Sequence, residues 1–206
     1  MARPRIISDE EILSAVRRCV FEHGPGVSTS CIAASIGISQ ATLFKRFDDK
    51  VNLLLCALAP QSPPLFLSLI QDCPSDPRAF KDAMITVGEA AMAHFRIVLP
   101  RIMAIRQAGI ASDRLMQHFD VPPPILVKQG MTSWFQRATD AGIIRCIDPS
   151  TFAFGFMGGL QVRVFFELMV QPTPEPNSDA TREEDRKHVE QLVDSLWHGI
   201  KPGGSV

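Results

Sequence analysis

A short polar run, residues 40–47, carries side chains suited to binding a nucleic acid. If the run is helical, Leu43 and Phe47 lie four residues apart and can face inward together. Its outward positions are then Gln40, Ala41, Thr42, Lys45 and Arg46. Glutamine and threonine can hydrogen-bond base edges, while lysine and arginine can contact phosphate or guanine. The run therefore predicts a helix that binds in the major groove of DNA.

Capping residues define the elements that must position this helix. Ser8 followed by Glu11 has the spacing of a capping box, which predicts the start of a first helix. A second short helix is expected over 28–36, with Gly37 at its C-terminal end. Ser39 is placed to cap the polar helix. Two short helices joined by a tight turn and braced by an earlier helix indicate a helix-turn-helix unit.

The charge of the chain is distributed unevenly. Its 206 residues hold 21 basic and 22 acidic side chains, which excludes binding through bulk positive charge. Residues 1–47 nevertheless hold six bases against four acids, and no acid lies between Glu22 and Asp48. The remaining residues, 48–206, hold 15 bases and 18 acids. The predicted DNA-binding helix therefore lies in a locally basic stretch.

The stretch from Ile12 to Leu58 resembles the N-terminal domain of the TetR-like (TetR/AcrR) transcriptional regulators. The matching segments are ILSAVRRCVFEHG, STSCIAASIGISQATLFKRF and DDKVNLL. The resemblance implies phosphate contacts from Thr29 and Lys50, and places Ser30 where some relatives contact a base through a longer side chain. It also places Phe44 where the family usually has a tyrosine whose hydroxyl binds phosphate. Phe44 lacks that hydroxyl, although it can still pack against the sugar-phosphate backbone.

Helical patterns continue to the end of the chain and predict an all-α protein of about nine helices without a sheet. We expect a DNA-binding domain over residues 1–50 and a larger helical domain for effector binding and dimerisation over 51–206. Asp48 is placed to cap the fourth helix. A long helix is expected from Pro77 to about Val98, with Pro100 separating it from a shorter one. The arm Arg3-Pro4-Arg5 suits either a minor-groove contact or a solvated tail.

The middle helices are expected to enclose a pocket for a small hydrophobic effector, since such pockets are mostly apolar with a few polar groups. The alternative for each residue is ordinary core packing. The candidate lining residues are Met92, Phe95, Met103, Phe119, Trp134, Phe135, Met157, Gln161 and Phe165.

The helix after Pro149 is apolar around nearly its whole circumference, which favours burial on one side by its own domain and on the other by a second copy. We therefore expect a homodimer through the last two helices, in a four-helix bundle. Arg163 interrupts the apolar helix and needs an acceptor, such as Glu167, a residue of the second copy or an anionic ligand. The expected interface residues are Phe152, Phe156, Gly159, Arg163, Val189, Leu192 and Leu196.

These features predict a ligand-responsive transcriptional repressor that releases a palindromic operator when its effector binds. One alternative is a DNA-binding dimer whose C-terminal domain binds a protein partner or no ligand. A second is a helical enzyme, but the sequence contains no recognisable catalytic motif, and we name no catalytic residue.

Cysteine and histidine spacing predicts no metal site, and no cofactor is expected. We found no convincing membrane span and no secretory peptide, so a cytoplasmic protein is expected.

Overall fold

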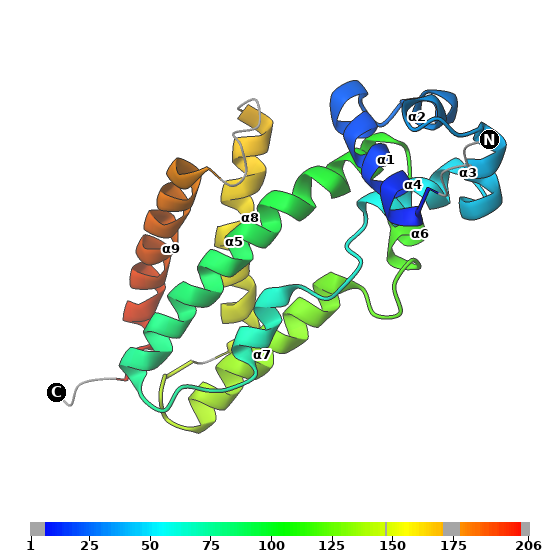
Figure 1. Ribbon diagram of the computed structural model, residues 1–206. Helices are drawn as coiled ribbons and strands as arrows, with labels where there is room; N and C mark the ends of the chain where they lie inside the picture. The colour runs from blue at the N-terminus through cyan, green and yellow to red at the C-terminus, as the bar shows by residue number, and fades with distance from the viewer. Residues whose placement is uncertain (1–6, 147, 171–177, 203–206) are drawn as a thin grey trace. The chain divides into compact units, whose positions relative to one another are not determined.

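The computed structural model describes residues 7–146, 148–170 and 178–202, and every regular element within these ranges is helical (Figure 1). The prediction of an all-α chain is confirmed. The elements are α1 (Asp9–His23), α2 (Thr29–Ser35), α3 (Gln40–Phe47), α4 (Lys50–Leu58), the 3-10 helix η1 (Leu65–Ile70), α5 (Pro77–Gln107), α6 (Ser112–Met116), α7 (Pro123–Asp140), α8 (Pro149–Val170) and α9 (Asp179–Ile200).

The predicted caps at the N-terminal helices are confirmed. The Ser8 hydroxyl accepts a hydrogen bond from the Glu11 backbone N–H, and the Glu11 carboxylate accepts one from the Ser8 backbone N–H. Ser39 caps α3 in the same manner, by accepting from the Thr42 N–H at 3.1 Å. Gly37, in the turn between α2 and α3, has a φ of +69°, a backbone conformation that favours glycine. These local interactions build the helix-turn-helix.

The cap of α4 is Asp49, so the prediction of Asp48 was wrong. Asp48 ends α3 with a φ of 62° and donates its backbone N–H to the Phe44 carbonyl. Asp49 has the extended backbone of an N-cap, and its carboxylate accepts from the Asn52 N–H at 2.7 Å. The left-handed residue at the end of α3 displaces the start of α4 by one position.

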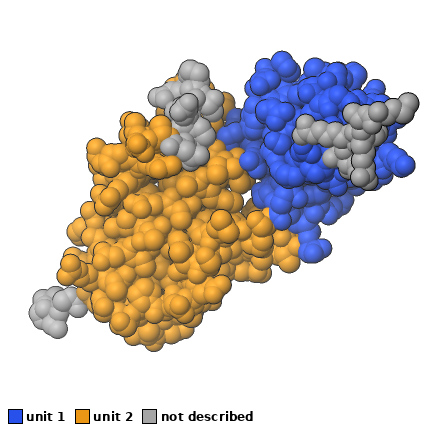
Figure 2. Space-filling view, viewed as in Figure 1, with its two compact units in different colours: residues 1–61, 100–120 blue, residues 62–99, 121–206 orange. Residues whose placement is uncertain are grey.

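The chain forms two compact units, drawn in different colours in Figure 2. Unit 1 contains residues 1–61 and 100–120, and unit 2 contains residues 62–99 and 121–206. Unit 1 buries one apolar cluster that includes Ile12, Leu43 and Ile105. Unit 2 buries another that includes Trp134 and Phe156. The predicted domain boundary at residue 50 is a functional division and stays a prediction. The division into compact units, by packing, instead falls after residues 61, 99 and 120.

Helix α5 runs without interruption from Pro77 to Gln107, so the predicted break at Pro100 was wrong. Proline removes one backbone donor and disfavours a helix interior, but packing can outweigh that preference. Met92 and Arg96 are buried in unit 2 before the proline, and Ala104 and Ile105 are buried in unit 1 after it. Burial on both sides of Pro100 therefore holds the helix together.

Helix α8 has one buried face and one exposed apolar face. Ala153, Phe156, Leu160 and Val164 face the core of unit 2. By length and composition α8 could cross a bilayer, with a mean hydropathy of 1.4 over an 18-residue window. A helix that is mostly buried in a protein core passes the same test, whereas 28% of this window of α8 is buried.

Gly88 allows α5 and α9 to approach closely. A Cβ atom at this position would lie 2.6 Å from Val189 Cγ1, and Val189 is fully buried. We expect Gly88→Ala to lower the free energy of unfolding by about 1–3 kcal/mol, because overpacking exceeds the gain in helix propensity. Urea denaturation at fixed protein concentration measures the change.

Gly199→Ala is the matched control for Gly88→Ala, since a Cβ atom there meets nothing within 4 Å. Val189→Ala removes the methyl groups that meet the new Cβ atom. The double variant Gly88→Ala, Val189→Ala should therefore be more stable than the sum of the single effects. Equal stability of Gly88→Ala and the native chain would contradict the close approach.

Candidate nucleic-acid interface

The five outward positions predicted on α3 are all exposed in the structure. Leu43 is fully buried and Phe47 nearly so, and both belong to the core of unit 1. Because these two side chains anchor one face, the opposite face is turned to solvent. The exposed residues are Gln40, Ala41, Thr42, Lys45 and Arg46. An exposed helix that presents amide, hydroxyl and cationic groups suits a DNA groove.

Gln40 is held by the first turn of α2. Its Nε2 donates to the Thr29 hydroxyl at 2.6 Å, and Thr29 is 7% exposed. The bond links the start of α3 to the residue for which the family resemblance implies a phosphate contact. It also occupies one amide donor of Gln40, so the side-chain carbonyl of Gln40 remains as an acceptor toward a base.

The two cations of α3 have different surroundings. Arg46 forms an ion pair with Asp9 at 2.6 Å and donates to the Ile7 carbonyl at 2.6 Å. Lys45 is exposed and makes no hydrogen bond or ion pair within the residues that the structure describes. Arg46 therefore tethers α3 to the start of α1, while Lys45 keeps its full charge available to a phosphate.

The other predicted DNA-binding residues lie on α2, α3 and α4 of the same unit. Ser30 is exposed, and its hydroxyl lies 2.9 Å from that of Ser28, the residue that caps α2. Phe44 is half-buried. Lys50, the first residue of α4, donates to the Gly26 carbonyl at 3.4 Å. Arg3 and Arg5 lie outside the described residues, so the structure says nothing of the predicted arm.

The nine predicted effector residues are divided between the two units. Met103 and Phe119 belong to unit 1, while the other seven belong to unit 2. Met92, Trp134 and Phe135 are fully buried in the core, with Phe95 and Met157 packed there too. Gln161 and Phe165 are exposed on α8. Aromatic and methionine residues at helical spacing occur both in cores and in pockets, so the sequence pattern could not separate the two.

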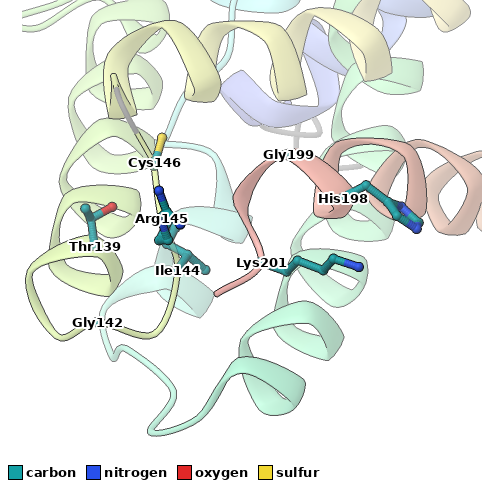
Figure 3. Close-up of a pocket in the computed structure, with 8 residues that line it drawn as sticks. All are labelled: Thr139, Gly142, Ile144, Arg145, Cys146, His198, Gly199 and Lys201. Atoms are coloured by element: carbon teal, nitrogen blue, oxygen red, sulfur yellow. The ribbon is translucent and has the colours of Figure 1, made fainter. Parts of the chain in front are cut away.

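A hollow of about 650 Å³ lies elsewhere in unit 2, at the ends of α7 and α9 (Figure 3). The backbone N–H of Arg145 donates to the Ile200 carbonyl at 2.6 Å, which links the segment after α7 to the end of α9. None of the predicted effector residues lines it. The lining residues are Thr139, Gly142, Ile144, Arg145, Cys146, His198, Gly199 and Lys201.

Two of the predicted interface residues face the interior of their own unit, and the other five are half-buried and stay predictions. Phe156 and Val189 are fully buried and present no surface to a second copy. Phe152, Leu192 and Leu196 pack against the same core, and a Cβ atom at Gly159 would lie 2.9 Å from Leu192 Cδ2. Arg163 forms an ion pair with Glu167 at 3.0 Å, but its Nε makes no hydrogen bond within the described residues.

The sequence predicts that α8 is apolar around nearly its whole circumference, but it does not separate the exposed residues from the buried ones. Phe165 is expected in the effector pocket, yet it lies on the exposed face. The exposed residues are Phe154, Val162, Phe165, Phe166, Met169 and Val170. All are large hydrophobic side chains with exposed fractions between 46% and 76%. These residues lie along one side of α8. Their helical spacing is not recognisable in the sequence, because the opposite side of α8 is apolar too.

A helix-turn-helix whose second helix is exposed and cationic, in an all-α chain, defines a DNA-binding regulator of transcription. Two family models match the chain accordingly. The model for bacterial regulatory proteins of the tetR family matches residues 12–57, and that for the C-terminal domain of AefR-like transcriptional repressors matches residues 83–197. The chain belongs to the TetR family of bacterial regulators. No curated protein sequence matches it.

Solved structures share the fold at low sequence identity. A TetR-family transcriptional regulator from Mesorhizobium loti is 20% identical with a TM-score of 0.67, over 94% of this chain and 96% of that one. NalD, the secondary repressor of the MexAB-OprM multidrug efflux pump in Pseudomonas aeruginosa, is 15% identical with a TM-score of 0.61, over 95% and 97%. The flavonoid-responsive regulator FrrA is 18% identical with a TM-score of 0.59, over 95% and 98%.

Proposed function

We propose that this TetR-family regulator is a homodimeric repressor that binds a palindromic operator and releases it when a small hydrophobic effector binds. The observation that carries the DNA-binding part is the exposed face of α3, with Lys45 unpaired within the described residues and Gln40 held by Thr29. A two-fold dimer presents two such helices to two half-sites of a palindrome. Its place of action is the cytoplasm, where bacterial DNA lies.

The composition of unit 2 supports the proposal of effector control. Its core contains several methionines beside aromatic side chains, including Met92, Met131 and Trp134. Methionine adapts its shape readily, so such an interior can rearrange around an apolar molecule. Release of DNA requires that the effector bind one conformation more tightly than the other. Because FrrA is a flavonoid-responsive regulator, flavonoids are a reasonable first class of compounds to test.

The closed core supports a second candidate, a DNA-binding dimer whose C-terminal part binds a protein partner or no ligand. Met92, Trp134 and Phe135 have no exposed surface, so the described conformation leaves no space beside them. A panel of flavonoids and other aromatic compounds tests the two candidates by release of bound DNA. Release by one of them supports the repressor with an effector. An unchanged complex with every compound favours the second candidate.

DNA binding is tested by selecting bound sequences from a random double-stranded pool with the full chain. We expect enrichment of a palindrome, and the absence of any enriched sequence would overturn the proposal. Lys45→Ala should weaken binding to the selected site by about tenfold and reduce the dependence of log affinity on log salt by about one unit. Fluorescence anisotropy across a salt series measures both.

Arg46→Ala and Lys187→Ala are the matched comparisons for Lys45→Ala. Arg46→Ala removes the tether to Asp9 and Ile7, so its effect should include a loss of thermal stability that Lys45→Ala does not show. Lys187 is an exposed lysine of α9, paired with Glu183 at 3.5 Å, and its replacement should leave DNA affinity unchanged. Equal affinity of the Lys45→Ala and native chains would remove Lys45 from the interface.

A further inference from the structure

The described chain begins at a point that is held against α3. Arg46, in the last turn of α3, donates to the backbone carbonyl of Ile7 at 2.6 Å and forms an ion pair with Asp9 at 2.6 Å. Ile7 itself packs against the apolar core of unit 1. Residues 1–6 lie outside the described residues, but they must join the chain at this point, beside the predicted DNA-binding helix.

Two arginines precede Ile7 closely enough to reach DNA beside α3. Arg5 is two residues and Arg3 is four residues before Ile7. An extended chain spans about 3.3–3.6 Å per residue, so the backbone of Arg3 can lie up to about 14 Å from Ile7 and that of Arg5 up to about 7 Å. The major groove is about 12 Å wide, and the minor groove lies across one sugar-phosphate strand from it. The segment is therefore long enough to reach a minor groove beside a helix in the major groove.

The acidic residues at the start of α1 already have partners in unit 1. Asp9 pairs with Arg46, and Glu10 pairs with Arg17 of the same helix. Glu11 accepts a hydrogen bond from the backbone N–H of the N-cap residue at 2.8 Å. The carboxylates nearest in sequence to the two arginines are therefore occupied, which favours DNA over α1 as the acceptor for their guanidiniums.

The segment Arg3-Pro4-Arg5 has the composition that a narrow minor groove favours. A narrow minor groove concentrates negative potential, which attracts arginine side chains. Proline disfavours a helical backbone at the residue before it, so the sequence favours an extended segment over a continuation of α1. An extended chain with two guanidiniums suits a groove only about 6 Å wide.

The contacts of Arg46 favour a positioning role for this residue over a contact with DNA of its own. One terminal nitrogen of its guanidinium donates to Ile7, and the other pairs with Asp9. The side chain is 31% exposed, although it belongs to the outward face of α3. Arg46 therefore uses its charge within unit 1, and it holds the residues before α1 next to α3.

We propose that residues 1–6 form a second DNA contact, in which Arg3 and Arg5 enter the minor groove next to α3 while Arg46 positions the segment. The proposal rests on the DNA-binding function proposed above and adds a sequence preference outside the bases that α3 contacts. In the minor groove a G·C pair differs from an A·T pair by the guanine amino group, and A-tracts narrow the groove. We therefore expect A·T pairs beside each half-site to be preferred.

The palindrome selected with the full chain provides the DNA for the test. Duplexes with the same half-sites and either A·T or G·C flanks are compared by fluorescence anisotropy. The native chain should bind the A·T-flanked duplex about tenfold more tightly. Inosine in place of the flanking guanines removes the amino group from the minor groove and leaves the major groove unchanged, so it should restore tight binding.

The double variant Arg3→Ala, Arg5→Ala tests the two side chains directly. It should bind all three duplexes with equal affinity, and its dependence of log affinity on log salt should fall by about two units per chain. The matched control is Arg182→Ala, Arg186→Ala on α9, which removes the same charge from side chains that are 68% and 62% exposed. The control should retain the flank preference of the native chain.

Arg46→Met tests the positioning role, because it keeps the apolar stem and removes the groups that hold Ile7 and Asp9. A general loss of structure would weaken binding to every duplex by the same factor. Loss of positioning should instead reduce the preference for A·T over G·C flanks, while a new selection still enriches the same half-sites. Circular dichroism verifies that the variant is folded at the assay temperature.

The possible outcomes separate this contact from the function on which it rests. The absence of any enriched sequence would overturn both. A selected palindrome that the native chain and Arg3→Ala, Arg5→Ala bind with equal affinity and equal salt dependence would overturn the second contact alone. A double variant with a weaker salt dependence but the native flank preference would place the two arginines on phosphates and overturn the minor-groove contact.

Discussion

Replacing Arg96 by alanine should lower the free energy of unfolding by about 3–5 kcal/mol, because it leaves a buried carboxylate without its partner. Arg96 of α5 and Asp185 of α9 are each 7% exposed. The Arg96 Nε lies 2.6 Å from one oxygen of Asp185, and a terminal nitrogen lies 2.5 Å from the other. The same guanidinium donates to Glu167 of α8 at 2.7 Å. Three helices therefore meet at one side chain.

The surroundings of Arg96 stabilise the charged form of its guanidinium. Its hydrogen bonds to Asp185 raise the pKa of the guanidinium above its ordinary value, against the opposing effect of burial. Arg96→Lys keeps the positive charge but loses the planar fork that binds both carboxylate oxygens. We therefore expect the lysine variant to lie between the alanine variant and the native chain in stability.

Urea denaturation at fixed protein concentration measures the Arg96 effect, since dimerisation would make stability depend on concentration. Arg186→Ala is the control, because Arg186 pairs at the surface with Glu190 at 3.1 Å and with Glu89 at 3.7 Å, and exposed ion pairs contribute little to stability. The double variant Arg96→Met, Asp185→Leu removes both charges and should recover much of the loss. A loss below about 1 kcal/mol for Arg96→Ala would show that Asp185 reaches solvent or another partner.

Trp134→Ala should lower the free energy of unfolding by about 3–5 kcal/mol, through a cavity in the core of unit 2. The side chain is fully buried and stacks on Phe80, with ring centroids 4.5 Å apart. Its indole N–H donates to the Asp72 carbonyl at 3.2 Å. The substitution therefore removes apolar contacts and leaves the Asp72 carbonyl without this donor.

Indole is a specific probe of the Trp134 cavity, since it has the shape of the missing side chain. It should raise the melting temperature of Trp134→Ala and leave the native chain unchanged, because a ligand that binds only the folded state stabilises it. Phe21→Ala is the control, as Phe21 is 55% exposed on α1 and its replacement should change stability by about 0.5 kcal/mol or less. A small loss for Trp134→Ala, with no response to indole, would place Trp134 outside the core.

Local signals made the helix-turn-helix predictable. The capping box of Ser8 and Glu11, the cap at Ser39 and the turn at Gly37 each depend on residues within a few positions of one another. The errors at Asp48 and Pro100 arose where a neighbouring element outweighed a local preference. Asp48 ends α3 with a positive φ, so Asp49 caps α4 instead. Helix α5 continues past Pro100 because residues on both sides of the proline are buried.

The ion-pair partners of Arg96 could not be predicted from sequence patterns. Asp185 and Glu167 lie 89 and 71 residues further along the chain, and no spacing rule connects residues so far apart. Gln40 and Thr29, only 11 residues apart, are joined across the turn of the helix-turn-helix, and the contact was likewise unforeseen. In both cases the contact exists because separate helices pack together.

The sequence by itself determined that the chain is helical, that its N-terminal part is a helix-turn-helix, and which face of α3 is exposed, because polar and apolar residues alternate there with the helical period. On α8 that alternation is missing, since large apolar residues cover nearly the whole circumference. Only the packing of α5, α7 and α9 decided that Phe156 is buried and Phe166 is exposed. The physical reason is that a hydrophobic pattern orients a helix only when its other face is polar.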